Sequence, residues 1–194
     1  VGAAEETTSG LRPLRSFDLR IPVLASNDAR SKTLFDNAYG TGQSCWTTIL
    51  DLIDPRGVGA PVAGMSVVVI GYGDVGRGCA RFGAALGARV TVVELDPVRA
   101  LQASMDGFTV ASLEETSPSA GMLISATGER ATIPLSALEA APDGAIVTVA
   151  GGVDGEVSID EAVAASWVMA ESGDPHVQTL TSPSGKTLRV LERG

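Results

Sequence analysis

Residues 71–76 combine residue types and spacing that suit the binding of phosphate. They read Gly-Tyr-Gly-Asp-Val-Gly, a G-x-G-x-x-G pattern that directly follows the apolar, β-branched run Ser66–Ile70 and begins a helical pattern. Gly71 permits a tight turn, Gly73 lets the backbone approach a pyrophosphate, and Gly76 lets the helix pack on the strand. The helix N-terminus offers free N–H groups and the positive end of its dipole to the phosphates.

A carboxylate completes this pattern. Glu94 ends the next expected strand, 18 positions after Gly76, where a carboxylate binds the adenosine ribose hydroxyls and repels a 2′-phosphate. The alternative is a glycine-rich turn beside a surface glutamate. Arg99 would pair with a 2′-phosphate, or it is a solvated helix arginine or an indirect cofactor contact. The combination predicts NAD rather than NADP.

Other cofactor contacts are expected where strands end, because binding loops gather at the carboxyl edge of a parallel sheet. Thr127 follows one expected strand, and Ala150, Gly151 and Gly152 follow another. The alternative for each is an ordinary turn. The helix that opens at the glycine pattern adds further predicted cofactor positions: Asp74, which would also cap the helix, Val75, Arg77 and Gly78.

Lys32 and Asp36 are four residues apart in a helical pattern over residues 29–54, which Asp28 would cap. Both side chains would project from one face and act on one hydroxyl. A lysine between a carboxylate and a nicotinamide would have a shifted pKa suited to proton transfer. The alternative is an exposed ion pair of little energetic consequence.

The elements that position these residues alternate between strand and helix from residue 65 onward. Connections this short require parallel crossovers, so the sequence predicts an α/β fold, a Rossmann-type doubly wound parallel sheet with a preceding hinge helix. The expected division is an irregular segment over 1–28, the hinge helix over 29–56 and the NAD-binding domain over 57–194. Near the end, Thr179-Leu180 and Thr187–Leu191 are expected as edge strands around a turn.

Composition excludes several classes of function. The 194 residues are 44% hydrophobic and carry a net charge of −9, which disfavours binding to nucleic acid or to an anionic membrane surface. Cys45 and Cys79 form no metal motif, and no metal is predicted. No apolar run reaches the ~18 residues of a membrane helix, and no secretory signal is expected, so the predicted location is cytoplasmic.

Several runs, taken in order, resemble the S-adenosylhomocysteine hydrolase family from about Glu5 to Glu192. They are residues 5–10 (Glu-Glu-Thr-Thr-Ser-Gly), Asn27-Asp28, Ser31-Lys32, 35–37 (Phe-Asp-Asn), Tyr39-Gly40, 71–80 (Gly-Tyr-Gly-Asp-Val-Gly-Arg-Gly-Cys-Ala), 94–97 (Glu-Leu-Asp-Pro) and 100–103 (Ala-Leu-Gln-Ala). The resemblance implies a bound NAD that oxidises the ribose 3′-hydroxyl of a nucleoside. Elimination at C5′, addition of water and reduction of the ketone would follow.

The resemblance also implies roles for individual residues. Glu6 matches a substrate-site carboxylate, and Lys32 and Asp36 match the polar pair at the reacting ribose. The remaining matches are cofactor contacts: Thr7, Thr8, Ser9, Asn37, Gly73 to Gly78 and Glu94. Four positions depart from the family: Thr41 stands for a cysteine, Val149 for an asparagine and Gly152 for a histidine, while His176 aligns with no catalytic histidine.

The family's substrate domain and C-terminal arm are absent from these 194 residues. The first hypothesis is therefore the NAD-binding domain of an adenosylhomocysteinase-like enzyme that acts on S-adenosylhomocysteine or a related nucleoside, weak or inactive as this chain alone. The alternatives are a divergent NAD-dependent nucleoside dehydratase or lyase of specialised metabolism, and a non-catalytic module that holds NAD. Expected partners are the nucleoside substrate and either further copies of the chain or a separate substrate domain.

Overall fold

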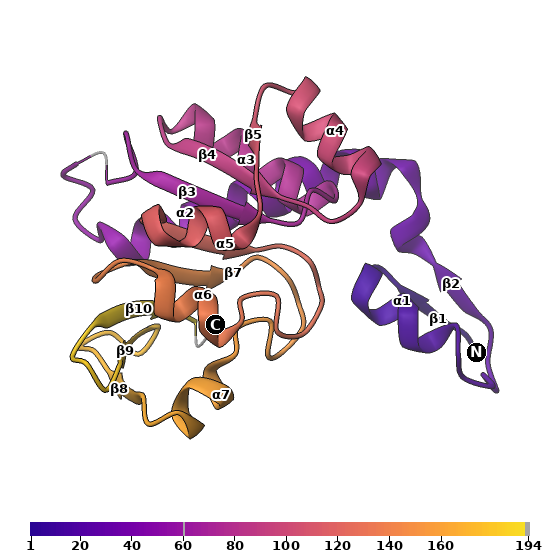
Figure 1. Ribbon diagram of the computed structural model, residues 1–194. Helices are drawn as coiled ribbons and strands as arrows, with labels where there is room; N and C mark the ends of the chain where they lie inside the picture. The colour runs from indigo at the N-terminus through magenta and orange to yellow at the C-terminus, as the bar shows by residue number, and fades with distance from the viewer. Residues whose placement is uncertain (60, 193–194) are drawn as a thin grey trace.

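A computed structural model describes residues 1–59 and 61–192 (Figure 1), in which most strands form one sheet. The sheet order is β5-β4-β3-β6-β7-β10-β9-β8. The strands are β3 (Ser66–Ile70), β4 (Arg89–Val93), β5 (Thr109–Val110), β6 (Met122–Ser125), β7 (Ile146–Val149), β8 (Val168–Glu171), β9 (Val177–Thr181) and β10 (Thr187–Leu191). The first six strands in this spatial order are parallel to one another: β5, β4, β3, β6, β7 and β10. Their order reverses between β3 and β6, which confirms the predicted doubly wound sheet.

Helices cover both faces of the sheet and bury a hydrophobic cluster on each. On one face lie α2 (Gly42–Ile53), α3 (Asp74–Ala85) and α4 (Pro97–Met105), whose cluster includes Trp46 and Cys79. On the other lie α5 (Leu113–Thr116), the short helix η3 (Ser117–Ser119), α6 (Leu135–Ala140) and α7 (Ile159–Ala164), whose cluster includes Leu138 and Trp167. Strands β3 and β6, which lie between the layers, are apolar along almost their whole length, as strands buried on both faces must be.

Residues 1–28, predicted to be irregular, contain regular structure. Strands β1 (Ala3–Glu5) and β2 (Val23–Ala25) pair in parallel, helix α1 (Thr8–Leu14) connects them, and the short helix η1 (Ser26–Asp28) follows. Thr7 caps α1, since its side chain accepts from the Gly10 N–H at 3.0 Å. Figure 1 shows this small unit beside the main sheet, with α1 toward the loops of the sheet's edge.

A helix is present where the hinge helix was predicted, but its first part has π-helical geometry. The π-helix η2 (Lys32–Thr41) runs directly into α2. Asp28 does not cap it: the cap position is Ser31, and Asp28 instead accepts from Arg15 at 2.9 Å. The glycines near residue 42 do not end the helix. A Cβ on Gly42 would lie 2.7 Å from the backbone of Gly78, so glycine there lets α2 and α3 cross closely.

The prediction that the last two strands lie at a sheet edge is wrong. Strand β10 lies inside the sheet, where it pairs in parallel with β7 and antiparallel with β9. The edge belongs to β8, which the sequence analysis missed. β10 therefore serves as the sixth parallel strand, and it ends at the same edge as β7.

Candidate functional site

The glycine pattern forms the turn between β3 and α3, and each glycine has a distinct environment. Gly71 adopts a φ of 94°, which favours glycine. A Cβ on Gly76 would lie 1.9 Å from the Gly71 carbonyl oxygen, so this glycine permits the close packing of helix on strand. A Cβ on Gly73 would have only Arg99 nearby, at 3.7 Å. The space over Gly73 is therefore open on the side that a pyrophosphate would approach.

The first turn of α3 differs from the prediction in one detail. Gly73, not Asp74, is the N-cap residue, and the Asp74 carboxylate accepts from Arg77 at 3.1 Å. Val75 is half-buried and packs against the core cluster of this face. A Cβ on Gly78 would lie 2.1 Å from the Ala38 carbonyl oxygen. Gly78 is thus required for helix crossing, whatever it also contributes to a ligand.

Glu94 lies at the end of β4, beside the glycine turn. One carboxylate oxygen accepts from the Tyr72 N–H at 2.7 Å, and the other accepts from the Leu95 and Asp96 N–H groups at 2.7 and 2.9 Å. These contacts fix the carboxylate next to the loop where an adenosine ribose would lie. Arg99 follows in the first turn of α4 and is exposed.

Tyr72 connects the glycine turn to the far end of α4. Its hydroxyl donates to Asp106 at 2.8 Å, and Arg81 donates to the same carboxylate at 3.4 Å. Burial, together with the hydrogen bond to Asp106, raises the pKa of Tyr72 well above its usual range. The tyrosine is therefore a neutral structural anchor at neutral pH.

Helix α1 lies against the loops that follow β6 and β7. Cβ atoms on Gly128 and Gly152 would lie 3.8 and 3.9 Å from the Ser9 side chain, and Arg12 of α1 forms an ion pair with Glu129. The structure thus brings Ser9 next to Gly152, two predicted cofactor positions that are far apart in sequence.

The hydroxyls of the N-terminal segment already have partners. Thr7 donates to the carboxylate of Glu5 at 2.7 Å, and Thr8 accepts from Asn27 at 3.2 Å. Hydrogen bonds from Thr7 lower the pKa of Glu5. Glu6, the predicted substrate carboxylate, is exposed.

Lys32 and Asp36 lie on one face at the start of η2, as predicted, and form the ion pair that the alternative interpretation expected. The lysine side chain is 20% exposed and the aspartate 58% exposed, so the lysine is the more enclosed partner. Asn37, the next residue, is buried. All three residues lie in the first part of the π-helix, and π-helical turns within α-helices are frequent at functional sites.

Thr127 and Gly151, two predicted cofactor positions, both contact a residue that the sequence analysis missed. Glu156 is 0% exposed. Its Oε2 accepts from the Thr127 hydroxyl at 3.0 Å, and a Cβ on Gly151 would lie 2.0 Å from its Oε1. Nothing in the local sequence distinguishes Glu156 from a surface acid, because its burial depends on two loops that are distant in the chain.

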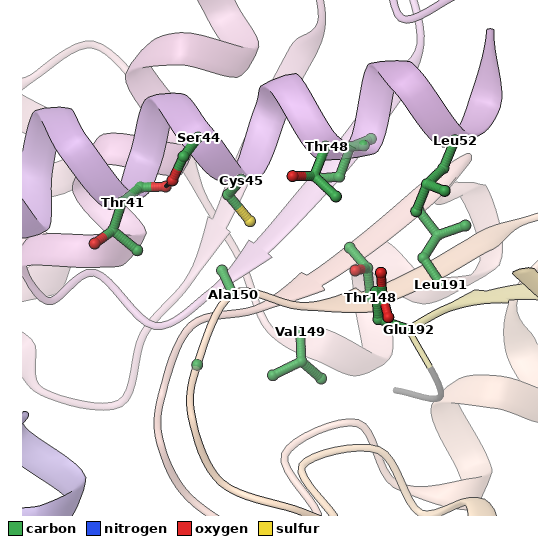
Figure 2. A pocket seen from close by; sticks show the side chains of 12 residues that line it. Thr41, Ser44, Cys45, Thr48, Leu52, Thr148, Val149, Ala150, Leu191 and Glu192 are labelled. Atoms are coloured by element: carbon green, nitrogen blue, oxygen red, sulfur yellow. Dashed lines mark hydrogen bonds between the residues drawn. The ribbon is translucent and has the colours of Figure 1, made fainter. Parts of the chain in front are cut away.

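Figure 2 shows a pocket of about 250 Å³ between α2 and the ends of β7 and β10. Small polar side chains of the helix line one wall, and the thiol of Cys45 points from α2 toward the Ala150 end of β7. A hydrogen bond with the buried Cys79 lowers the pKa of Cys45. The other lining residues are Thr41, Ser44, Thr48, Ile49, Leu52, Thr148, Val149, Gly151, Leu191 and Glu192.

Comparison with known families identifies the domain. A family model described as "S-adenosyl-L-homocysteine hydrolase, NAD binding domain" matches residues 37–194. The chain belongs to this family. The expected resemblance is thereby confirmed, and NAD is the cofactor of this domain.

Curated relatives agree along the whole chain. The adenosylhomocysteinases of Thermotoga maritima and Thermococcus kodakarensis are each 42% identical to it and are matched over 100% of this chain. An S-inosyl-L-homocysteine hydrolase of Methanothermobacter thermautotrophicus is 38% identical. The chain spans about half the length of these relatives, 47%, 45% and 46% respectively.

Solved structures support the fold alone. The A chain of dipicolinate synthase from Bacillus subtilis superposes with a TM-score of 0.61 at 17% identity, covering 84% of this chain and 53% of that one. The corresponding subunit from Bacillus halodurans gives 0.57 at 18% identity, over 79% and 53%. The Rossmann-type fold is therefore shared well beyond this family.

The residues of the structure suit NAD. The open face of Gly73, the N-terminus of α3 and the fixed carboxylate of Glu94 would hold a pyrophosphate and an adenosine ribose. Across residues 1–59 and 61–192, no group of three histidine, cysteine or acidic side chains is arranged to hold a metal ion. None of the helices within those ranges is long and apolar enough to cross a membrane.

Proposed function

We propose that this chain is the NAD-binding part of an enzyme that oxidises, at the ribose 3′ position, S-adenosylhomocysteine or a related homocysteine nucleoside, eliminates the 5′ group, adds water and reverses the oxidation. Residues 57–194 would form the NAD-binding domain, 29–56 the hinge helix and 1–28 the edge of the substrate domain. The observation that carries the proposal is Lys32 paired with Asp36 on a helix packed against the NAD domain.

Bound NAD supplies a reversible hydride acceptor for the ribose 3′ carbon. As a neutral amine, Lys32 would take the proton of the 3′-hydroxyl and become the ammonium ion that pairs with Asp36, and it would return that proton when the ketone is reduced. Glu6 would contact the substrate, while Asn37, Thr7, Thr8 and Ser9 would contact the cofactor. The remaining predicted contacts would hold the dinucleotide: Gly71, Gly73, Asp74, Val75, Gly76, Arg77, Gly78, Glu94, Arg99, Thr127, Ala150, Gly151 and Gly152.

The proposal also covers the purine base of the substrate and the protein partner that the complete reaction needs. Because one relative is named for an inosyl rather than an adenosyl substrate, the domain would tolerate either purine, and the base would be selected elsewhere. The complete reaction would require either further copies of the chain or a substrate domain, since a reactive ketone needs a site that excludes water.

The test loads the chain with NAD and measures the absorbance of reduced nicotinamide after addition of adenosine. We expect an increase with the natural chain and none with Lys32→Met, which keeps most of the side-chain volume and removes the amine. Calorimetry should show equal NAD affinity for the two proteins. No increase at saturating adenosine, with NAD bound, would contradict oxidation by this chain alone and would favour a cofactor domain whose chemistry needs a substrate domain.

A further inference from the structure

We propose that Glu156 is a positioning residue of the NAD site, whose buried carboxylate holds the loops after β6 and β7 in their binding conformation. The inference rests on the proposed cofactor positions at this edge of the sheet. Glu156 itself lies below those loops and acts through Thr127 and Gly151.

The first contact is with the loop after β6. Glu156 Oε2 accepts from the hydroxyls of Ser125 and Thr127 and, at 3.4 Å, from the Thr127 N–H. Ser125 is the last residue of β6 and is fully buried. One carboxylate oxygen therefore fixes both the strand end and the direction in which the chain leaves it.

The second contact is with the loop after β7. Glu156 Oε1 is buried and has no hydrogen-bond partner. It lies against Gly151, where any Cβ would come within 2.0 Å of it. A Cβ at position 151 would therefore force this carboxylate to move, although the φ of Gly151 requires no glycine on conformational grounds.

The connection continues to helix α1. The Thr127 hydroxyl donates to Glu156 and accepts from the Glu129 N–H at 3.1 Å, so its single proton is used within the protein. The Glu129 carboxylate in turn pairs with Arg12. A displacement of Glu156 would therefore change both loops at the cofactor edge and, with them, the surface on which α1 rests.

Burial of an acid at this place is costly unless donors compensate it. The donors come from the last residue of β6 and the loop that follows it, and the restriction on shape comes from the loop after β7. A core residue that only filled space would need neither the hydrogen-bond donors nor a glycine beside it. This division of contacts points to positioning of the two loops relative to each other.

The test measures NAD affinity by calorimetry and folding by urea unfolding, for the natural chain and for Glu156→Ala and Glu156→Gln. We expect Glu156→Ala to weaken NAD binding at least tenfold in protein that is still folded. Glu156→Gln keeps an acceptor oxygen for Ser125 and Thr127, so it should recover most of the affinity. Ser158→Ala is the matched control, because Ser158 is also buried, with no partner for its hydroxyl, and should leave NAD affinity unchanged.

A second pair of variants tests the contact with Gly151. Gly151→Ala alone should weaken NAD binding, because the new methyl group displaces the carboxylate. Gly151→Ala combined with Glu156→Ala should bind no worse than Glu156→Ala alone, since the collision is gone. If Glu156→Ala does not fold, Thr127→Val, which removes only the hydroxyl link, carries the same expectation of weakened binding.

The outcomes separate this inference from the proposed function. Failure of the natural chain to bind NAD would refute the cofactor site, and the inference with it. Normal NAD affinity in folded Glu156→Ala or Thr127→Val, beside a natural chain that binds NAD, would refute the positioning role alone. Additive losses in the Gly151 and Glu156 pair would also refute it.

Discussion

Replacing either of two glycines in the same turn by alanine should weaken NAD binding, but only one of the two replacements should lower the free energy of unfolding. Gly76→Ala places a methyl group 1.9 Å from the Gly71 carbonyl oxygen. Both partners are backbone, so either the strand or the helix must move. Overpacking of this kind costs about 1–3 kcal/mol, and we expect a lower free energy of unfolding together with weak NAD binding.

Gly73→Ala is the matched control, because its methyl group would meet only Arg99 at 3.7 Å. Its φ of −70° suits alanine. Alanine is the poorer residue at an N-cap, but reduced freedom of the unfolded chain offsets this by about 0.4–1 kcal/mol. The free energy of unfolding should therefore stay within about 0.5 kcal/mol of the natural value, while NAD affinity falls at least tenfold, or about 1.4 kcal/mol.

The assay is urea unfolding without cofactor, followed by calorimetric titration with NAD, for both variants. The two measurements separate damage to the fold from obstruction of the ligand. Natural NAD affinity in Gly73→Ala would refute a pyrophosphate path over this glycine. An unchanged unfolding midpoint in Gly76→Ala would refute the packing role that its contacts indicate.

Three further predictions concern charge and burial. Glu94→Gln should narrow the preference for NAD over NADP in competitive titrations, because the charge that repels a 2′-phosphate is removed; an unchanged ratio would contradict this. Hydrogen bonds from the Thr187 N–H and hydroxyl lower the pKa of Asp143, so the stability that the Asp143 carboxylate contributes is present near neutral pH and is lost as the pH falls through the lowered pKa. Asp143→Asn should therefore flatten the acid side of a plot of urea midpoint against pH. An equally steep plot for the variant would contradict this contribution of Asp143. Trp46→Phe removes a buried hydrogen bond to the Cys79 carbonyl at 2.8 Å and should reduce the free energy of unfolding by about 1–3 kcal/mol. If urea titrations show a loss of unfolding free energy below about 0.5 kcal/mol, the indole contributes little.

The sheet was predictable because its strands carry strong local signals. Ser66–Ile70 and Met122–Ser125 are short apolar runs with turn residues on either side, and the helix patterns between them leave room only for parallel crossovers. The place of β10 was not predictable in this way. A strand beside a tight turn looks the same in sequence whether its other side is paired or exposed, and β8 is largely exposed, with no alternating pattern to reveal it.

In the candidate site, too, features set by local spacing could be predicted, and features set by contacts between distant segments could not. The glycine turn and Glu94 were predictable because spacing along the chain determines their geometry. The approach of Ser9 to Gly128 and Gly152 required the fold, since α1 reaches the sheet edge through contacts between distant segments. Glu156 was missed because a buried acid resembles a surface acid until its donors are known.

The two hydrophobic layers each contain one tryptophan, and the chain has two in all. Trp46 reports on the layer between the sheet and α2–α3, and Trp167 on the layer beneath α6 and α7. Their intrinsic fluorescence is therefore a pair of separate optical reporters, one for each side of the sheet. With each replaced in turn, spectroscopy could follow the cofactor-side helices and the opposite layer as independent signals, without an attached dye.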